Sequence, residues 1–185
     1  RNKARQSPPA GRDISAIARA MYAFEDRAVP HLAELMLAPR AETRLCAILL
    51  ATQHVCAELL PPVYKCLFDP EAQVRMQAAA ALPLFRNVKA FGETRAMLRK
   101  KAAAENEPIA GRQAALEAIS VLRDAGSIEV LAKLCTHPTR QLSVPAHRAL
   151  MAITGQDFGD ADKKWRAWFS KNKERHRAEW LIDSL

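Results

Sequence analysis

The stretch that decides the fold runs from residue 69 to residue 82 and reads Asp69-Pro-Glu-Ala-Gln-Val-Arg-Met-Gln-Ala-Ala-Ala-Ala-Leu82. Asp69 and Pro70 interrupt the preceding element, and Glu71 suits the first turn of a helix because its charge complements the helix dipole. The small residues at 78–81 allow a neighbouring helix to pack closely. The apolar side chains that follow Pro70 recur at helical spacing and form one stripe, made of Val74, Ala78, Leu82 and Phe85.

The composition predicts helix along nearly the whole chain. Six glycines in 185 residues are few, and 49% of the residues are hydrophobic. Ala, Leu, Arg, Glu and Lys dominate, and these residues have high helix propensity. A chain of this length can also bury a substantial core. We therefore expect an all-α fold.

The pattern of the quoted stretch recurs elsewhere in the chain. Pro39 and Pro70 are 31 residues apart, and each ends an apolar helix that has another proline near its start. Arg44, Arg75 and Arg112 occupy matching positions, at intervals of 31 and 37 residues. Periods in this range are typical of arrays of paired helices.

The breaks between helical segments divide the chain into a tail and a repeat domain. Residues 1–12 carry four cations and few apolar side chains, so we expect a flexible basic tail or linker. In the first helix of the second repeat, the apolar stripe is expected at Leu45, Ile48, Leu49 and Thr52. The repeat domain spans 13–185, with approximate repeats at 13–39, 40–69, 70–105, 106–138 and 139–185.

The quoted stretch resembles the first helix of a HEAT repeat, in which Asp69-Pro70 is followed by Val74-Arg75, Ala78-Ala79 and Leu82. Residues 28–36, Ala-Val-Pro-His-Leu-Ala-Glu-Leu-Met, are similar to the second helix. The resemblance covers most of 13–155. It implies a HEAT-like solenoid, a right-handed α–α superhelix of four to five helical hairpins. Such proteins usually act as protein-binding scaffolds, so the resemblance also implies a non-catalytic adaptor.

The C-terminal segment carries two tryptophans three residues apart. Thr154-Gly155 and Phe158-Gly159 precede a helix with Trp165 and Trp168, an order similar to the closing segment of many bacterial HEAT-repeat proteins. The resemblance therefore implies a bacterial source. Trp165, Trp168 and Phe169 share one side of the expected helix, so we expect a C-terminal capping helix that covers the apolar end of the array. An aromatic pocket for a peptide or a nucleobase is the alternative.

The sequence contains no convincing catalytic, cofactor-binding or metal-binding constellation. The five histidines form no His-x-x-x-His pair, and Cys46, Cys56, Cys66 and Cys135 form no Cys-x-x-Cys pair. No glycine-rich phosphate loop or Gly-x-Ser-x-Gly elbow is present. We therefore expect a protein that is not an enzyme and binds no cofactor. The cysteine pattern and the lack of an apolar run of about 20 residues predict a soluble, cytoplasmic chain.

The net charge of +8 is unevenly distributed. Residues 1–12 carry +4 and residues 86–101 carry +5, so the rest of the chain is nearly neutral. Arg95 and Arg99 are four residues apart on one helix face and can engage carboxylates or phosphates together. A solvated helix face is the alternative. The expected binding surface for an acidic partner protein consists of Arg95, Arg99, Lys100 and Lys101.

Nucleic-acid binding is the runner-up function. The basic third repeat and the basic tail could contact phosphates together, as in the HEAT-like alkylpurine DNA glycosylases. Those enzymes use a catalytic Asp framed by aromatic residues on the concave surface, whereas the tryptophans here cluster at one end of the chain. The other second helices also carry few cations. We therefore expect a protein–protein interaction module first.

Overall fold

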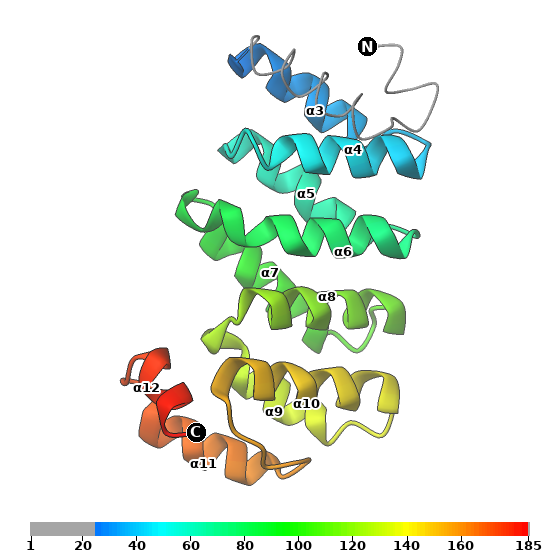
Figure 1. Cartoon of the computed structure of the whole chain (residues 1–185). Coiled ribbons are helices and arrows are strands. Elements are labelled where there is room, and N and C mark those ends of the chain that lie inside the picture. Colours follow the sequence, from blue (N-terminus) through cyan, green and yellow to red (C-terminus); the bar gives the residue numbers. More distant parts are fainter. Residues whose placement is uncertain (1–24, 185) are drawn as a thin grey trace. The chain divides into compact units, whose positions relative to one another are not determined.

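The computed structural model describes residues 25–184, and every regular element in that range is a helix (Figure 1). The all-α prediction is confirmed for this part of the chain. The expected tail at 1–12 and the expected first helix of the first repeat lie outside the described residues. The chain divides into two compact units, Arg1–Gly92 and Glu93–Leu185, and each is described by itself.

The first unit is built from short helices that pack side by side. Helix α4 contacts α3 on one flank and α6 on another, and α5 contacts α6. In chain order its described elements are η1 (Glu25–Ala28), α3 (Val29–Leu35), α4 (Ala41–Ala51), η2 (Ala57–Leu59), α5 (Leu60–Cys66), α6 (Ala72–Ala81) and η3 (Leu82–Asn87).

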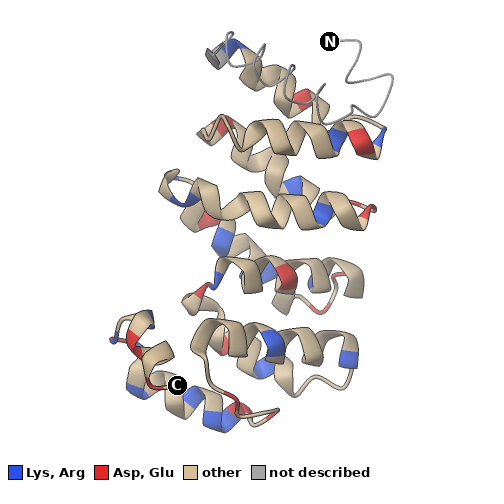
Figure 2. Cartoon of the chain, in the orientation of Figure 1, with Lys and Arg blue, Asp and Glu red and all other residues tan. Residues whose placement is uncertain are grey.

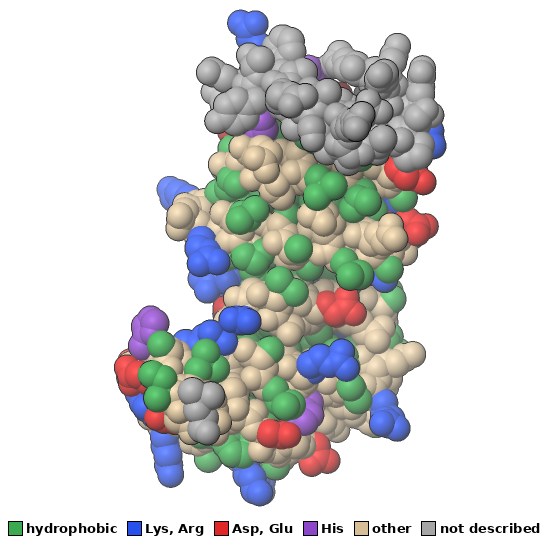
Figure 3. All heavy atoms as spheres, in the orientation of Figure 1, with side chains coloured by type: hydrophobic (Ala, Val, Ile, Leu, Met, Phe, Trp, Pro, Cys, Tyr) green, Lys and Arg blue, Asp and Glu red, His purple; other side chains and the backbone are tan. Residues whose placement is uncertain are grey.

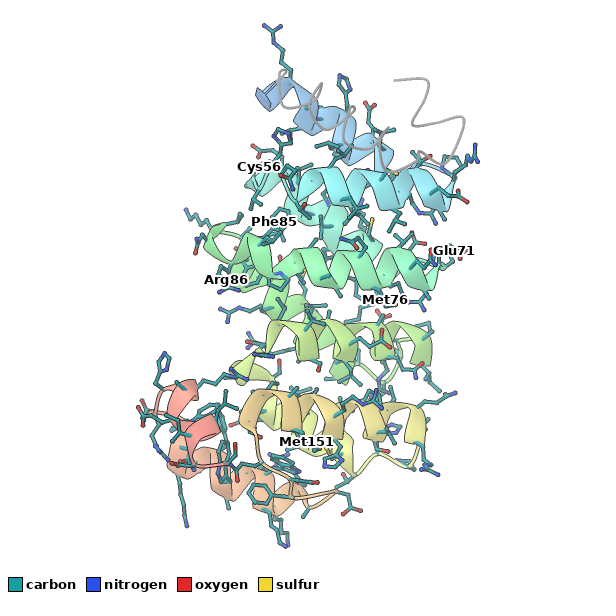
Figure 4. All side chains as sticks on the ribbon, in the orientation of Figure 1. Cys56, Glu71, Met76, Phe85, Arg86 and Met151 are labelled. Carbon is teal, nitrogen blue, oxygen red and sulfur yellow. The ribbon has the colours of Figure 1, made fainter. Side chains whose placement is uncertain are left out.

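The apolar stripe predicted from the 69–82 stretch is the buried face of α6 and η3. Its four members, Val74, Ala78, Leu82 and Phe85, are each at most 1% exposed. Phe85, labelled in Figure 4, lies in η3, which continues α6 as a tighter helix. The helix start depends on Asp69, because its Oδ1 accepts a hydrogen bond of 2.9 Å from the amide of Glu71.

The stripe predicted for the second repeat was wrong in detail. Of its four residues only Ile48 is buried, whereas Leu45, Leu49 and Thr52 are half-buried. Because α4 contacts helices on two flanks, its buried surface is broader than a single stripe and includes small residues. The buried residues of α4 are Thr43, Cys46, Ala47, Ile48, Leu50 and Ala51.

The second unit is organised around α10, which packs against α8, α9 and α12, while α11 packs against α9. Leu98, Leu116, Ile119 and Trp165 are among its fully buried side chains. Helix α7 begins at the end of the first unit and runs into the second. The elements are α7 (Phe91–Ala103), α8 (Ile109–Leu122), η4 (Ala125–Ser127), α9 (Ile128–Cys135), α10 (Arg140–Thr154), α11 (Asp162–Asn172) and α12 (Arg177–Ile182).

The C-terminal aromatic residues pack against one another. The indole of Trp165 is fully buried and donates a hydrogen bond of 2.9 Å to the carbonyl of Gly159. Trp180 is also buried and donates to the carbonyl of Asn172 over 2.9 Å. Trp168 is half-buried and meets Trp180 edge to face, with 5.3 Å between ring centroids. Trp168 and Trp180 thus hold α11 and α12 together, whereas Trp165 ties α11 to the loop that follows α10.

Three arginines that match in the sequence make the same kind of contact. Arg44 donates to the carbonyls of Ala38 and Pro39, and Arg75 donates to the carbonyls that follow α5, those of Asp69 and Pro70. Arg112 donates to the carbonyl of Ala102 in the last turn of α7. Each guanidinium thus satisfies backbone acceptors at the end of the helix that precedes its own.

No helix within residues 25–184 has both the length and the apolar content needed to cross a bilayer.

Candidate functional site

The predicted basic surface lies on α7, and two of its arginines point to one carboxylate. Arg95 Nη1 is 3.3 Å from Asp124 Oδ1, and Arg99 Nη1 is 3.3 Å from Asp124 Oδ2. The Asp124 side chain is 1% exposed and also accepts a hydrogen bond of 2.6 Å from Ser127 Oγ. Gly126 leaves room for this arrangement, because a Cβ at that position would meet Arg99 Nη1. The arginines therefore join α7 to the turn between α8 and α9.

The two lysines of the predicted surface have different surroundings. Lys101 Nζ is 2.7 Å from Glu107 Oε2, in the loop that follows α7. Lys100 is exposed, and no carboxylate of the described residues lies within ion-pair distance of it. Three of the four predicted residues thus have a carboxylate partner within the second unit, so their charge is partly neutralised there. Their binding of a partner protein stays a prediction.

A groove of about 560 Å³ lies between α8 and α10. Figure 3 shows hydrophobic side chains among acidic and basic ones on the face that these helices form. Val121 and Val144 are 47% and 44% exposed although they are apolar. Met151, labelled on α10 in Figure 4, is also exposed. The groove is lined by Gln113, Leu116, Glu117, Ser120, Val121, Arg140, Gln141, Val144, Pro145 and Arg148.

The α10 side of the groove alternates charged and apolar residues. Arg140, Val144 and Arg148 are separated by four residues each, so they lie along one face of the helix. Neither arginine forms an ion pair with any residue in the described part of the chain, and both are exposed. Two uncompensated guanidinium groups therefore flank an exposed valine.

Pro145 lies inside α10 and lines the same groove. Proline has no backbone N–H, so the carbonyl of Gln141 cannot receive the usual hydrogen bond from the residue four positions ahead. Gln141 also lines the groove. Helix α10 therefore lacks one regular backbone hydrogen bond beside the groove.

A second basic surface lies on α11. Figure 2 shows Lys and Arg segments along this helix. Lys164 and Lys171 are seven residues apart and share one face of the helix, and Lys163 projects about 100° around the axis from Lys164. The three lysines are exposed and have no ion pair among the described residues. Arg166, by contrast, is paired with Asp162 over 2.6 Å.

The thiols of the chain are poorly suited to nucleophilic chemistry. All four cysteines are free, and Cys46, Cys66 and Cys135 are buried. Burial raises the pKa of the Cys66 thiol to about 11 and that of Cys135 to about 12. A thiol is a weak nucleophile until it ionises, so both are inert near neutral pH.

Histidines and carboxylates do not gather into a metal-binding cluster within residues 25–184. His147 Nε2 and Asp157 Oδ1 form a side-chain hydrogen bond of 2.8 Å. Asp157 also accepts from the amide of Gly159, and these two hydrogen bonds, the backbone one first, lower the pKa of Asp157. The pair fixes the loop after α10 against that helix.

Sequence reasoning placed the binding surface on α7 and missed the groove between α8 and α10. The signal was present as Arg140-x-x-x-Val144-x-x-x-Arg148, a repeat of four residues that puts two cations and an apolar side chain on one helix face. The spacing alone does not show that α8 packs beside α10, and the groove exists only because these two helices are in contact. The exposed lysines of α11 were also missed, although Lys164 and Lys171 have a helical spacing of seven residues in the sequence.

No protein-family model matches the chain. No curated protein matches it either.

Proposed function

We propose that this chain is a non-catalytic protein-interaction module and that a partner protein docks in the groove between α8 and α10. The observation that carries the proposal is the groove itself, where exposed Val121 and Val144 lie beside two arginines that have no ion pair within the described residues. Exposed apolar side chains rimmed by charge are typical of interaction sites. The four α7 cations, Lys100 above all, form a second proposed contact surface.

We also propose that the helices belong to a HEAT-like right-handed solenoid of a bacterial cytoplasmic protein. The sequence resemblance supports this, and so do the matching carbonyl contacts of Arg44, Arg75 and Arg112 at intervals of 31 and 37 residues. In such an array the helices are ordered before binding, so a docking surface loses little conformational entropy when the partner arrives.

The test compares capture of proteins by three forms of the chain. Tagged wild-type chain is incubated with bacterial lysate beside the double variant Val121→Ser, Val144→Ser, and retained proteins are quantified by mass spectrometry. Met76→Ser is the matched control, because Met76 is an apolar side chain of the first unit and is 70% exposed. All three chains should have the same melting temperature, since exposed substitutions usually change stability little.

The proposal predicts a discrete protein that the wild type and the Met76→Ser control retain and the double variant loses. Equal retention by all three forms would show that the groove is not the docking site. If no protein is retained and the chain binds nucleic acid tightly, nucleic-acid binding replaces protein docking as the proposed function.

The second candidate function is nucleic-acid binding, and the exposed lysines of α11 favour it. Lys163, Lys164 and Lys171 can each neutralise one phosphate, so log K should fall with log salt at a slope of about −0.9 per contact on a duplex. A salt series with a mixed-sequence duplex and a single strand measures this slope. Changing the three lysines to Glu should abolish binding if α11 is the site, and unchanged binding would place the site elsewhere.

A further inference from the structure

The charged and apolar residues along the groove between α8 and α10 are spaced so that they favour one order of side chains in a bound peptide. The geometry points to an extended peptide segment of the form acidic-x-apolar-x-acidic, bound along α10 with its acidic side chains on Arg140 and Arg148. This inference rests on the proposed function and names the ligand class for the same groove. It is argued from the spacing of residues along α10 and from the charges that line the groove.

The register of α10 matches that of an extended chain. Residues four apart on a helix are separated by about 6 Å along its axis, so Arg140, Val144 and Arg148 present charge, apolar surface and charge at about 6 Å intervals. In an extended peptide, alternate side chains point to the same side and repeat every 6.6 Å or so. Residues 1, 3 and 5 of such a peptide can therefore meet the three α10 residues together.

The charges of the groove determine the sign of the charge on the ligand. Arg140 and Arg148 have no carboxylate partner among the described residues, and each guanidinium can bind a carboxylate through two parallel hydrogen bonds. Glu117 on α8 is the acidic member of the lining. It repels carboxylates placed on the α8 side, so acidic side chains of the ligand are directed toward α10.

Segment length favours an extended ligand over a helical one. An extended chain meets Arg140, Val144 and Arg148 with about five residues, whereas a helical ligand needs about nine, because its contacting residues must be four apart to keep a spacing of about 6 Å. An isolated helix of that length is only marginally stable in water.

The experiment measures binding of fluorescent synthetic peptides to the full chain by polarisation at low salt. The probe carries Glu-Ser-Leu-Ser-Glu between Gly-Ser flanks. Matched peptides carry Lys-Ser-Leu-Ser-Lys, which reverses the charge, and Glu-Glu-Leu-Ser-Ser, which keeps the composition and changes the spacing. A third peptide places Glu, Leu and Glu four residues apart in an alanine-based helix.

Two charge-reversed chains complete the design. Arg140→Glu with Arg148→Glu changes the groove, and Lys65→Glu with Lys133→Glu makes the same change of net charge at exposed positions on α5 and α9, outside both proposed contact surfaces. If the Arg140→Glu, Arg148→Glu variant does not fold, the double variant Arg140→Gln, Arg148→Gln replaces it. Melting curves check the fold of each chain.

We expect the wild type and the Lys65, Lys133 control to bind the Glu probe at least tenfold more tightly than either of the two matched extended peptides. The groove-reversed chain should prefer the Lys peptide, and the Gln variant should lose the preference. Equal binding of the Glu-Glu-Leu-Ser-Ser peptide, preference for the helical peptide, or an unchanged preference in the groove variants would each overturn the inference.

The two proposals fail in different ways. If no peptide binds while Val121→Ser with Val144→Ser still abolishes capture of a protein, the extended-peptide inference is wrong and the docking groove stands. If no peptide binds and capture does not depend on the groove, both are wrong.

Discussion

Arg44 and Asp69 form a two-pronged ion pair between α4 and the residues that precede α6. Arg44 Nε is 2.6 Å from Asp69 Oδ2, and Nη2 is 2.7 Å from Oδ1. The side chains are only 11% and 6% exposed. The same guanidinium holds the carbonyls after α3, and the same carboxylate caps the amide of Glu71. One pair of residues therefore joins the start of α4 to the start of α6 in the first unit.

Asp69→Asn should destabilise the first unit by roughly 2–4 kcal/mol at neutral pH. The substitution removes the partner charge of a guanidinium that is largely buried, and an unpaired charge in such a place is costly. Urea unfolding of the variant and the wild type measures the difference. Glu42→Gln is the control on α4, because Glu42 is exposed and its nearest charge contact, with Arg40, is 3.9 Å long.

The contribution of Asp69 should also depend on pH. Burial alone raises the pKa of Asp69, but the hydrogen bonds from Arg44 and from the Glu71 amide outweigh it, and the net pKa lies below the ordinary value of 3.8. The unfolded chain therefore takes up the proton first as the pH falls. The stability difference from Asp69→Asn should be full above pH 3.8 and shrink as the pH drops further. A difference that stays constant through that range would contradict this assignment.

Changing both α7 arginines to Glu should destabilise the second unit by about 3 kcal/mol. The substitutions would place two carboxylates beside Asp124, whose side chain is 1% exposed, and remove its cationic partners. Lys100→Glu on the same helix should change stability by no more than about 0.5 kcal/mol, since Lys100 is exposed. Denaturant unfolding of both variants is the measurement. Equal stability of the double variant and Lys100→Glu would mean that the arginines serve binding alone.

The tryptophans of α11 should differ in their effect on stability. Trp165→Ala removes a fully buried indole and its hydrogen bond to Gly159, so a loss of about 3–5 kcal/mol is expected. Trp168 is half-buried, and Trp168→Ala should cost about 2 kcal/mol. Thermal melting of both variants compares them. If Trp168→Ala is as costly as Trp165→Ala, its packing with Trp180 contributes more than its exposure indicates.

Local patterns predicted the helices well, because a helix depends on residues within a turn or two of each other. The stripe made of Val74, Ala78, Leu82 and Phe85 is buried, as its apolar spacing predicted. The interval between Arg44 and Arg75 predicted matching positions, and the two side chains make matching carbonyl contacts. Repetition in the sequence thus carried information about contacts as well as about helices.

Contacts between residues that are far apart in the chain could not be predicted from the sequence. Arg95 and Arg99 were expected on an open surface, because nothing in their spacing indicates that Asp124, 29 and 25 residues later, comes to lie beside them. Arg123 adopts a left-handed conformation, with φ of 51°, at the end of α8. Glycine is the usual residue at such a helix end, so the arginine gave no indication that α8 ends there. The groove depends on how α8 and α10 pack, which no single helix determines.

Gly155 and Gly159 both have positive φ, but only Gly155 has atoms close to the position of an added Cβ. Alanine substitutions at the two positions therefore distinguish the cost of backbone strain from the cost of a packing clash. Gly155 ends α10 with φ of 75°, and a Cβ there would approach Leu181 Cδ2 to 3.0 Å. Gly159 has φ of 58° and nothing within 4 Å of an added Cβ. Gly159→Ala should therefore cost about 1 kcal/mol from the left-handed backbone alone, and Gly155→Ala about 2–3 kcal/mol because α12 must also shift. Equal melting temperatures would show that α12 yields without cost.

Thiol reactivity should single out one cysteine. Cys56, labelled in Figure 4, is half-buried, whereas the other three are buried. Burial raises the pKa of all four thiols, but exposure still lets a reagent reach Cys56. In the folded chain an aromatic disulfide reagent should modify Cys56 first, and the remaining thiols should react only at the rate of unfolding. Cys56→Ser should abolish the fast phase, and urea should make the remaining thiols react together. A fast phase that survives in Cys56→Ser would mean that the helices around Cys46, Cys66 or Cys135 open readily without global unfolding.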